Sequence, residues 1–180
     1  MKKLMPGANI GGFISLEFFK NNAFTIDNQK KILTIEADSA LFRIKSAGVK
    51  VPISVDKNGI SVSIQMPLIL PNGTKISVVV DSGSQALILN DHFFDELKIS
   101  KNNKNVKYMV GKDETGQQFR RIFTNLRGKI HVPSHPEINV ESIKVMFQKI
   151  IYDGLAGQFF LKKFIITYDL KRSLMIFRRY

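Results

Sequence analysis

An internal repeat constrains the fold of this chain more than any other feature of its sequence. Residues 11–35 align without gaps on residues 153–177, at an offset of 142 residues. Two unrelated β-hairpins can resemble each other by chance, but self-similarity at a fixed offset indicates a duplicated structural unit. Apolar positions mostly match apolar ones, and distinctive residues keep register: Gly12 with Gly154, Phe18 with Phe160, Lys20 with Lys162, Thr25 with Thr167 and Asp27 with Asp169.

The repeat also predicts how the chain is divided. The second copy closes a long segment of strand-like sequence, whereas no such segment stands ahead of the first copy. Residues 1–50 are therefore predicted to be the last part of one lobe plus a linker, and residues 51–180 a complete lobe. A chain of 180 residues is long enough for a lobe with a real core.

Most of the hydrophobic periodicity is typical of β-strands. Short β-rich runs are separated by turn signals such as Asp-Lys-Asn-Gly and Pro-Asn-Gly. Residues 106–123 read as two strands joined by a glycine-bounded tip, and residues 133–137 as a rigid loop. The remaining predicted strands are residues 23–27, 31–37, 48–55, 59–70, 74–80, 126–132 and 143–151.

Helical spacing is convincing only in residues 90–99. Phe93, Phe94 and Leu97 form an apolar stripe there, and Asn90 or Asp91 can cap the helix. We therefore predict a mostly β protein with one or two short helices.

Composition excludes several classes of protein. The chain has no cysteine, which rules out disulfides, thiolate metal sites and a cysteine nucleophile. No run of residues has the roughly 20 apolar side chains of a membrane helix. The N-terminal residues lack the apolar core of a signal peptide, so a cytoplasmic location is the default expectation.

Basic residues exceed acidic ones by 27 to 15, which gives a net charge of +12. Nine of the basic residues lie between Lys98 and Lys129, beside only two acids, Asp113 and Glu114. This balance raises nucleic acid or another anionic surface as a partner, although a solvated face with a positive bias is the commoner explanation.

A carboxylate stands where a buried strand should end. Three valines, residues 78–80, run into Asp81-Ser82-Gly83-Ser84, and apolar sequence then resumes. Asp and Gly are common turn residues, so an ordinary turn is one explanation. About 70 residues later, within the second copy of the repeat, the chain reads Asp153-Gly154-Leu155-Ala156-Gly157.

This order of elements resembles the retropepsin-like aspartic proteases, and more closely the bacterial two-lobed members of that clan. The resemblance covers residues 51–180 as one lobe and residues 11–35 as the end of another. It implies a retropepsin-like closed β-barrel lobe, preceded by the partial remnant of a second such lobe. The residues that carry it are Asp81, Ser82, Gly83 and Ser84 in the active-site turn, and Gly154, Leu155, Ala156 and Gly157 in the glycine element.

The resemblance implies an aspartic endopeptidase that acts on peptides or proteins and uses neither a metal nor another cofactor. In such enzymes two carboxylates share one proton around a water, because like charges a few ångströms apart do not both ionise easily. Asp81 would be one member of that pair. Gly83 would permit a close backbone approach, and the Ser82 hydroxyl would bond to the opposite loop.

Residues 110–118 fall where the family places its flap, a hairpin that closes over the substrate. Gly111 and Gly116 would make this segment flexible, and Lys112 would favour acidic peptides. An ordinary hairpin loop is the alternative.

One lobe supplies one aspartate, whereas the chemistry needs two. The nearest second candidate, Asp38-Ser39-Ala40, lacks the glycine, and Asp153 is better explained as a turn residue. Either two copies associate as a homodimer, each contributing Asp81, or a missing N-terminal lobe supplies the second carboxylate.

Two alternatives to an active enzyme follow. A catalytically incomplete module of the same fold could bind peptides as a scaffold. A basic nucleic-acid-binding β-domain is the third candidate, although aromatic and basic residues do not alternate as a base-stacking surface requires. His131 and His135 are assigned to the surface, because Pro133 and Pro136 argue against the helix that would bring them to one metal.

Overall fold

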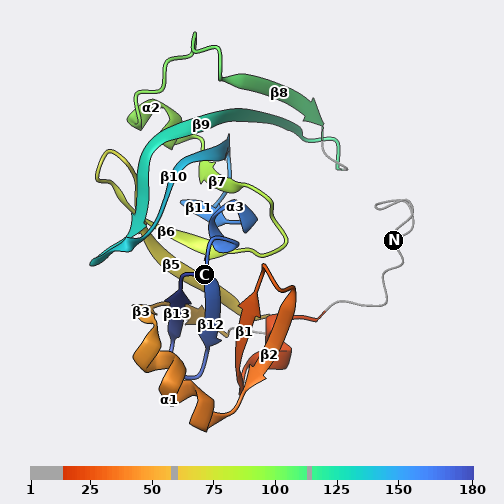
Figure 1. The fold of residues 1–180 in the computed structure, drawn as a ribbon. Helices are drawn as coiled ribbons and strands as arrows, with labels where there is room; N and C mark the ends of the chain where they lie inside the picture. Colours follow the sequence, from red (N-terminus) through yellow and green to blue (C-terminus); the bar gives the residue numbers. More distant parts are fainter. Residues whose placement is uncertain (1–13, 58–60, 113–114) are drawn as a thin grey trace.

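The computed structural model describes residues 14–57, 61–112 and 115–180. Strands make up most of the regular structure, and they form two sheets (Figure 1). The eight-stranded sheet lies above the five-stranded one in Figure 1, and one apolar core includes side chains from both. The predicted mostly β architecture is confirmed.

The eight-stranded sheet curls into a barrel. Its order is β4-β5-β6-β11-β7-β10-β9-β8, and a further pairing of Ile69 with His131 joins β5 to β9. That pairing closes a ring of six strands, as the prediction of a closed barrel requires. The strands are β4 (Ser54–Asp56), β5 (Ser63–Ile69), β6 (Lys75–Val80), β7 (Leu87–Asn90), β8 (Lys107–Lys112), β9 (Gln118–Val132), β10 (His135–Gln148) and β11 (Gly154–Ala156).

The five-stranded sheet is antiparallel throughout and has the order β2-β1-β12-β13-β3. Its central pairing joins β1 to β12, so both copies of the repeat lie side by side in it (Figure 1). The strands are β1 (Ala23–Asp27), β2 (Ile32–Glu36), β3 (Val49–Pro52), β12 (Ile165–Asp169) and β13 (Leu174–Arg178).

The elements of the two copies coincide at the offset of the repeat. The 3-10 helix η1 (Leu16–Phe19) corresponds to α3 (Gln158–Leu161), β1 to β12 and β2 to β13, with the same bounds in each pair. Lys31 and Ser173, which are also equivalent, both have a positive φ in the hairpin turn. Equivalent sequence has therefore produced equivalent backbone, residue by residue.

The longest helix, α1 (Asp38–Ala47), was not expected from the sequence. Its two buried residues, Leu41 and Ile44, are three positions apart and therefore lie on one face. The helix packs against β13, and Lys45 forms an ion pair with the buried Asp169 at 2.8 Å. The predicted helix at residues 90–99 does form, but α2 (His92–Glu96) has only five residues.

The rigid loop predicted at residues 133–137 is wrong. Only Pro133 and Ser134 form a turn, with a φ of 60° at Ser134, and the flanking residues belong to β9 and β10. Pro136 is tolerated in β10 because the pairing with β9 is irregular between His135 and Asn139, where no ladder hydrogen bond is needed.

Candidate functional site

Asp81 lies at the carboxyl end of β6, where the strand leaves the barrel. Its backbone N–H donates to the carbonyl of Ala156 at 3.1 Å, which continues the parallel pairing of β6 with β11. One carboxylate oxygen, Oδ1, accepts the N–H of Gly83 at 2.9 Å, and the Asp81 carbonyl accepts the N–H of Ser84 at 3.2 Å. The carboxylate is thus held by its own turn and is half-buried.

The glycine element packs directly against this turn. A side chain at Gly157 would begin 2.2 Å from the carbonyl oxygen of Ala86 and 2.5 Å from that of Ser84. At Gly154 it would begin 2.6 Å from the carbonyl oxygen of Ile88. Contacts that short exclude any Cβ, so both positions require glycine. Two motifs about 70 residues apart in sequence therefore form one structural unit.

Gln158 ties the two motifs together, and the sequence did not single it out. Its side-chain amide donates to the carbonyl of Ser82 at 2.8 Å, and its backbone N–H donates to that of Ser84 at 2.8 Å. The N–H of the next residue, Phe159, donates to the carbonyl of Gln85. Ser82 thus contacts Gln158 through its backbone carbonyl, and this hydrogen bond stays within the lobe.

A cavity of about 210 Å³ opens beside Asp81. Among the described residues that line it, Asp81 is the one carboxylate, and the remainder of the wall is mostly apolar. Burial raises the pKa of the Tyr168 phenol, so that side chain stays neutral. The cavity is lined by Leu16, Phe24, Ile26, Ile64, Val80, Asp81, Ser82 and Tyr168.

The same cavity lies over the centre of the repeat. Thr25 and Thr167 are equivalent residues, they face each other across β1 and β12, and their hydroxyl oxygens are 2.7 Å apart. An approximate two-fold axis therefore passes between them. Phe24 stacks on Tyr168 next to this point, with ring centroids 4.7 Å apart, and both rings line the cavity that holds Asp81.

The predicted flap corresponds to the hairpin of β8 and β9, and Asp113 and Glu114 at its tip lie outside the described residues. Gly111 is inside β8, opposite Phe119, whose ring lies 2.7 Å from where a Cβ would stand. Gly116 has a φ of +82°, and Lys112 is exposed. Closure over a substrate stays a prediction.

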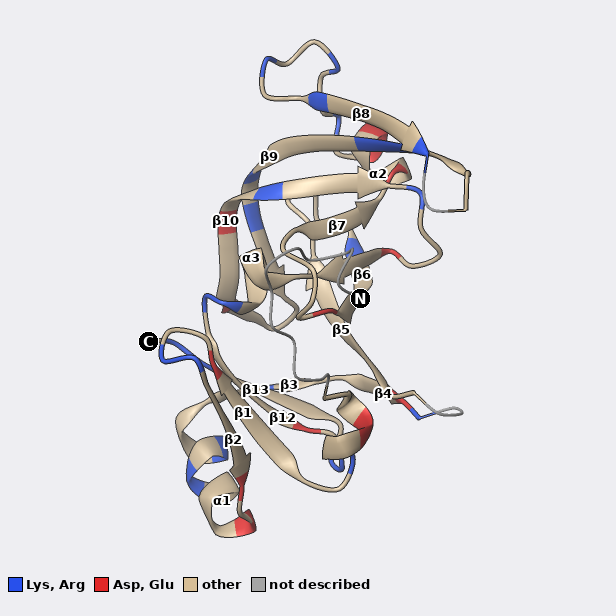
Figure 2. Ribbon diagram, turned by 90° about the vertical axis from the view of Figure 1, so that its right-hand side faces the viewer, with Lys and Arg blue, Asp and Glu red and all other residues tan. Residues whose placement is uncertain are grey.

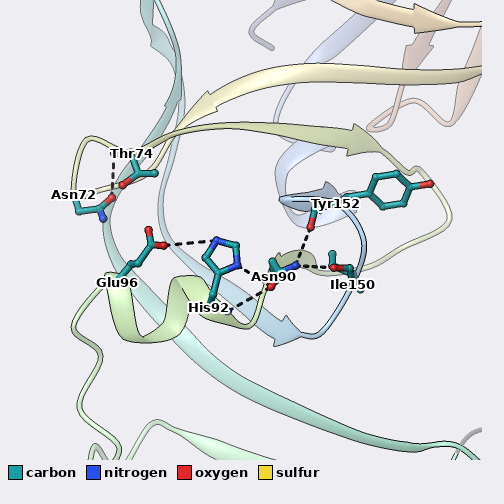
Figure 3. Close-up of polar contacts among 7 residues, drawn as sticks. All are labelled: Asn72, Thr74, Asn90, His92, Glu96, Ile150 and Tyr152. Carbon is teal, nitrogen blue, oxygen red and sulfur yellow. Dashed lines mark hydrogen bonds and ion pairs between the residues drawn. The ribbon is translucent and has the colours of Figure 1, made fainter.

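Asn90 forms hydrogen bonds with the segment that leads into the glycine element (Figure 3). Its side-chain amide donates to the carbonyls of Ile150, at 2.6 Å, and Tyr152, at 3.3 Å. Its Oδ1 lies 2.8 Å from Nδ1 of His92, whose other nitrogen faces Glu96 at 3.7 Å. The residue proposed as a helix cap therefore also fixes the segment that leads into β11.

Among the described residues, no Lys or Arg lines the cavity beside Asp81. Lys and Arg recur along β8 and β9 (Figure 2), and several have acidic neighbours, such as Arg120 near Asp91 and Lys129 near Glu141. Two larger hollows, of about 460 and 580 Å³, share Lys144 and Phe159 and lie away from the Asp81 carboxylate. Across the described parts of the chain, no three acidic or histidine side chains are grouped as metal ligands. No described helix is long and apolar enough to cross a membrane.

Comparison with known proteins finds similarity among solved structures. No protein-family model matches the sequence, and no curated protein does. The fold is similar to the crystal structure of a retropepsin-like aspartic protease from Rickettsia conorii, with 17% sequence identity and a TM-score of 0.48. The match covers 72% of this chain and 90% of that one.

Proposed function

We propose that this chain carries half of an aspartic peptidase active site. Asp81 would share one proton with a second carboxylate, so that one of the two activates a water as base while the other protonates the leaving amine. The pair would titrate as a unit rather than as two independent acids. The substrate would be a peptide or protein segment in extended conformation.

One observation carries this proposal: the cavity that holds Asp81 lies over the approximate two-fold axis between Thr25 and Thr167. A carboxylate related to Asp81 by that axis would enter the same region from the opposite side. The turn that holds Asp81 is fixed by several backbone and side-chain hydrogen bonds and by Gly157, which suits a group that must keep its position during catalysis.

The division of the chain is part of the proposal. Residues 1–50 would be the last part of a first lobe plus a linker, and residues 51–180 the complete second lobe. The coincidence of η1, β1 and β2 with α3, β12 and β13 supports this division.

A second candidate function is a peptide-binding module that does not cut. The observation in its favour is that Asp81 is the one carboxylate that the described part of the chain contributes to the cavity. A single carboxylate cannot serve as base and acid at the same time in this mechanism.

Cleavage of an unstructured peptide library between pH 4 and 7, with and without pepstatin, tests the proposal. Pepstatin-sensitive cleavage should fall by at least about 100-fold in Asp81→Asn, the scale of lost acid–base catalysis. Asp95→Asn is the matched control, because Asp95 is exposed and its carboxylate does not line the cavity. Cleavage that is indifferent to Asp81→Asn would contradict the proposal, and peptide binding without cleavage would favour the second candidate.

A further inference from the structure

A groove lined with lysines lies beside β10 and α3. It consists of the two larger hollows, of about 460 and 580 Å³, which meet at Lys144 and Phe159. None of the described residues that line it also lines the cavity beside Asp81. We call it the lysine groove, after the five exposed lysines that line it: Lys104, Lys107, Lys144, Lys162 and Lys163.

The charges of the lysine groove are not neutralised within the protein. Glu141 is the one acid among its described lining residues, and the Glu141 carboxylate lies 3.7 Å from Nζ of Lys129, which does not line the groove. Across the described ranges of the chain, no ion pair joins a lysine of the groove to a carboxylate. Charges of one sign gathered in a hollow raise the local concentration of the opposite sign. The lysine groove therefore suits an anionic partner.

The internal repeat explains why Lys162 has no acidic partner. Its equivalent in the first copy, Lys20, forms an ion pair with Glu17. The residue equivalent to Glu17 is Phe159, so the second copy has an aromatic ring where the first has a carboxylate. Nζ of Lys162 lies 5.3 Å from the centroid of that ring. Lys162 can therefore bind an external carboxylate without giving up an ion pair of its own.

One wall of the lysine groove is the edge of a strand. Six consecutive residues of β10, 139–144, line the smaller hollow. Successive side chains of a strand point to opposite faces, so a hollow that touches all six is bordered by their main chain. Among the described strands, β7 pairs with β10 from Val145 to Gln148, which leaves residues 139–144 with β9 alone. Ser142, with a φ of 51°, forms a bulge in this edge.

A free strand edge binds an extended peptide through main-chain hydrogen bonds. We propose that the lysine groove binds an acidic, extended segment of a partner protein, whose main chain bonds to the edge of β10 on either side of the bulge and whose carboxylates pair with the lysines. Binding there requires neither Asp81 nor a second carboxylate, so it does not depend on the proposed function.

Two other occupants fit the lysine groove less well. A second copy of this chain offers no acidic segment, since no more than two acidic residues are consecutive in its sequence. A single-stranded nucleic acid has no backbone N–H groups for a strand edge, and its bases stack on open aromatic rings. The ring of Phe159 already has Lys162 over one face.

A synthetic peptide of about eight residues in which glutamate and valine alternate can serve as the probe, because it favours an extended conformation and carries its carboxylates on one face. Fluorescence anisotropy with the full chain measures its dissociation constant. Lys144→Glu combined with Lys162→Glu should weaken binding by at least about 10-fold, since two attractions become repulsions.

Lys50→Glu combined with Lys75→Glu is the matched control, because it changes the net charge equally. Both lysines are exposed, and neither lines a hollow of the lysine groove. The control should change the dissociation constant by less than about 2-fold, as expected for charges that do not touch the peptide. Equal weakening by the two double variants would overturn the proposal.

Two methylated peptides test the bonds to the strand edge. Each keeps every carboxylate but carries N-methyl groups on alternate backbone nitrogens, along one edge of the peptide in the first and along the opposite edge in the second. At least one of them should bind about 10-fold more weakly than the probe, since it loses hydrogen bonds to β10. Unchanged affinity of both would overturn the proposal, because charge alone would then hold the peptide.

Three further measurements exclude the other occupants and the other site. Asp81→Asn should leave probe binding unchanged, and a loss of binding would instead place the probe in the cavity of the proposed active site. An oligothymidylate that binds more tightly than the probe, and is released by Lys144→Glu, would overturn the proposal in favour of nucleic acid. A dimer of the full chain, in sedimentation, that Lys144→Glu dissociates would overturn it in favour of a second copy.

Discussion

The segments 14–36 and 156–178 form equivalent elements with the same bounds, yet β2 of the first is mostly exposed whereas β13 of the second is mostly buried. In the second segment, β13 has the barrel on one face and α1 on the other. In the first segment, residues 32–35 of β2 are exposed. The comparison teaches that local sequence is sufficient for the hairpin, whereas burial depends on which neighbour covers it. Matched substitutions at equivalent positions can measure that difference.

The largest difference is expected between Met175→Ala and Leu33→Ala. Met175 is fully buried, so its truncation leaves a cavity and should lower the free energy of unfolding by about 2–5 kcal/mol. Leu33 is 47% exposed, and its truncation should cost about 0.5 kcal/mol. Urea denaturation of both variants measures the two values. Equal losses would mean that the first copy is covered by something within the chain.

The next difference concerns Gly157→Ala and Ser15→Ala. The new methyl group at position 157 would meet the carbonyl oxygens of Ser84 and Ala86, and we expect a loss of about 1–3 kcal/mol or more. Ser15 is exposed, so its substitution should be nearly neutral. Thermal unfolding followed by circular dichroism distinguishes them. A neutral Gly157→Ala would show that the Asp81 turn does not need this close approach.

The turn aspartates of the two hairpins differ in their partners. Asp169 is buried, bonds to the N–H and Nη1 of Arg172, and pairs with Lys45. Asp27 accepts the N–H groups of Gln29 and Lys30. Asp169→Asn should therefore cost about 1–3 kcal/mol, since two cations lose their carboxylate, and Asp27→Asn about 0.5–1 kcal/mol. Chemical denaturation in low and high salt checks this, and a loss independent of salt would point to packing instead of charge.

The smallest effect is expected at the axis itself. The Thr25 hydroxyl bonds to the Glu36 carboxylate and to the hydroxyl of Thr167. Thr25→Val leaves the buried Thr167 hydroxyl without that partner and should cost about 1 kcal/mol. Thr25→Val with Thr167→Val should cost less than the sum of the two single variants, because both hydroxyls are then gone. Strict additivity in a double-mutant cycle would show that the two hydroxyls do not interact.

Much of the fold could be predicted from the sequence because its signals are local. Period-2 runs bounded by turn residues identified β1, β2, β5 and β6. The helix α1 was not predicted, although Leu41 and Ile44 are spaced three residues apart, as on one face of a helix. Residues 133–137 were misread because proline and serine signal a loop, whereas the irregular pairing near Pro136 lets the strand continue. That pairing depends on β9 and is not visible in β10 alone.

The candidate site also contains some residues that local motifs predict and others that only the pairing of distant strands brings together. Asp81 and the glycine element were identified from their motifs, but no sequence motif indicates that Gln158 links them. Gln158 contacts the turn only because β11 lies beside β6, and that adjacency joins segments more than 70 residues apart. Likewise, Asn90 or Asp91 was predicted to cap the helix, and the structure places Asp91 at the N-cap without a side-chain cap hydrogen bond. The bonds of Asn90 to Ile150 and Tyr152 follow from the pairing of β7 with β11.

The sequence by itself determined that one hairpin unit occurs twice, that the chain is mostly strands, and that a carboxylate follows the end of an apolar strand. Those properties follow from side-chain period and turn chemistry, which act over a few residues. Only the tertiary structure decided that the two units meet at Thr25 and Thr167, that Asp81 shares a cavity with Phe24 and Tyr168, and that β2 stays exposed. Such properties depend on pairings between distant strands, where the free energy comes from shared burial and not from the residues of either strand alone.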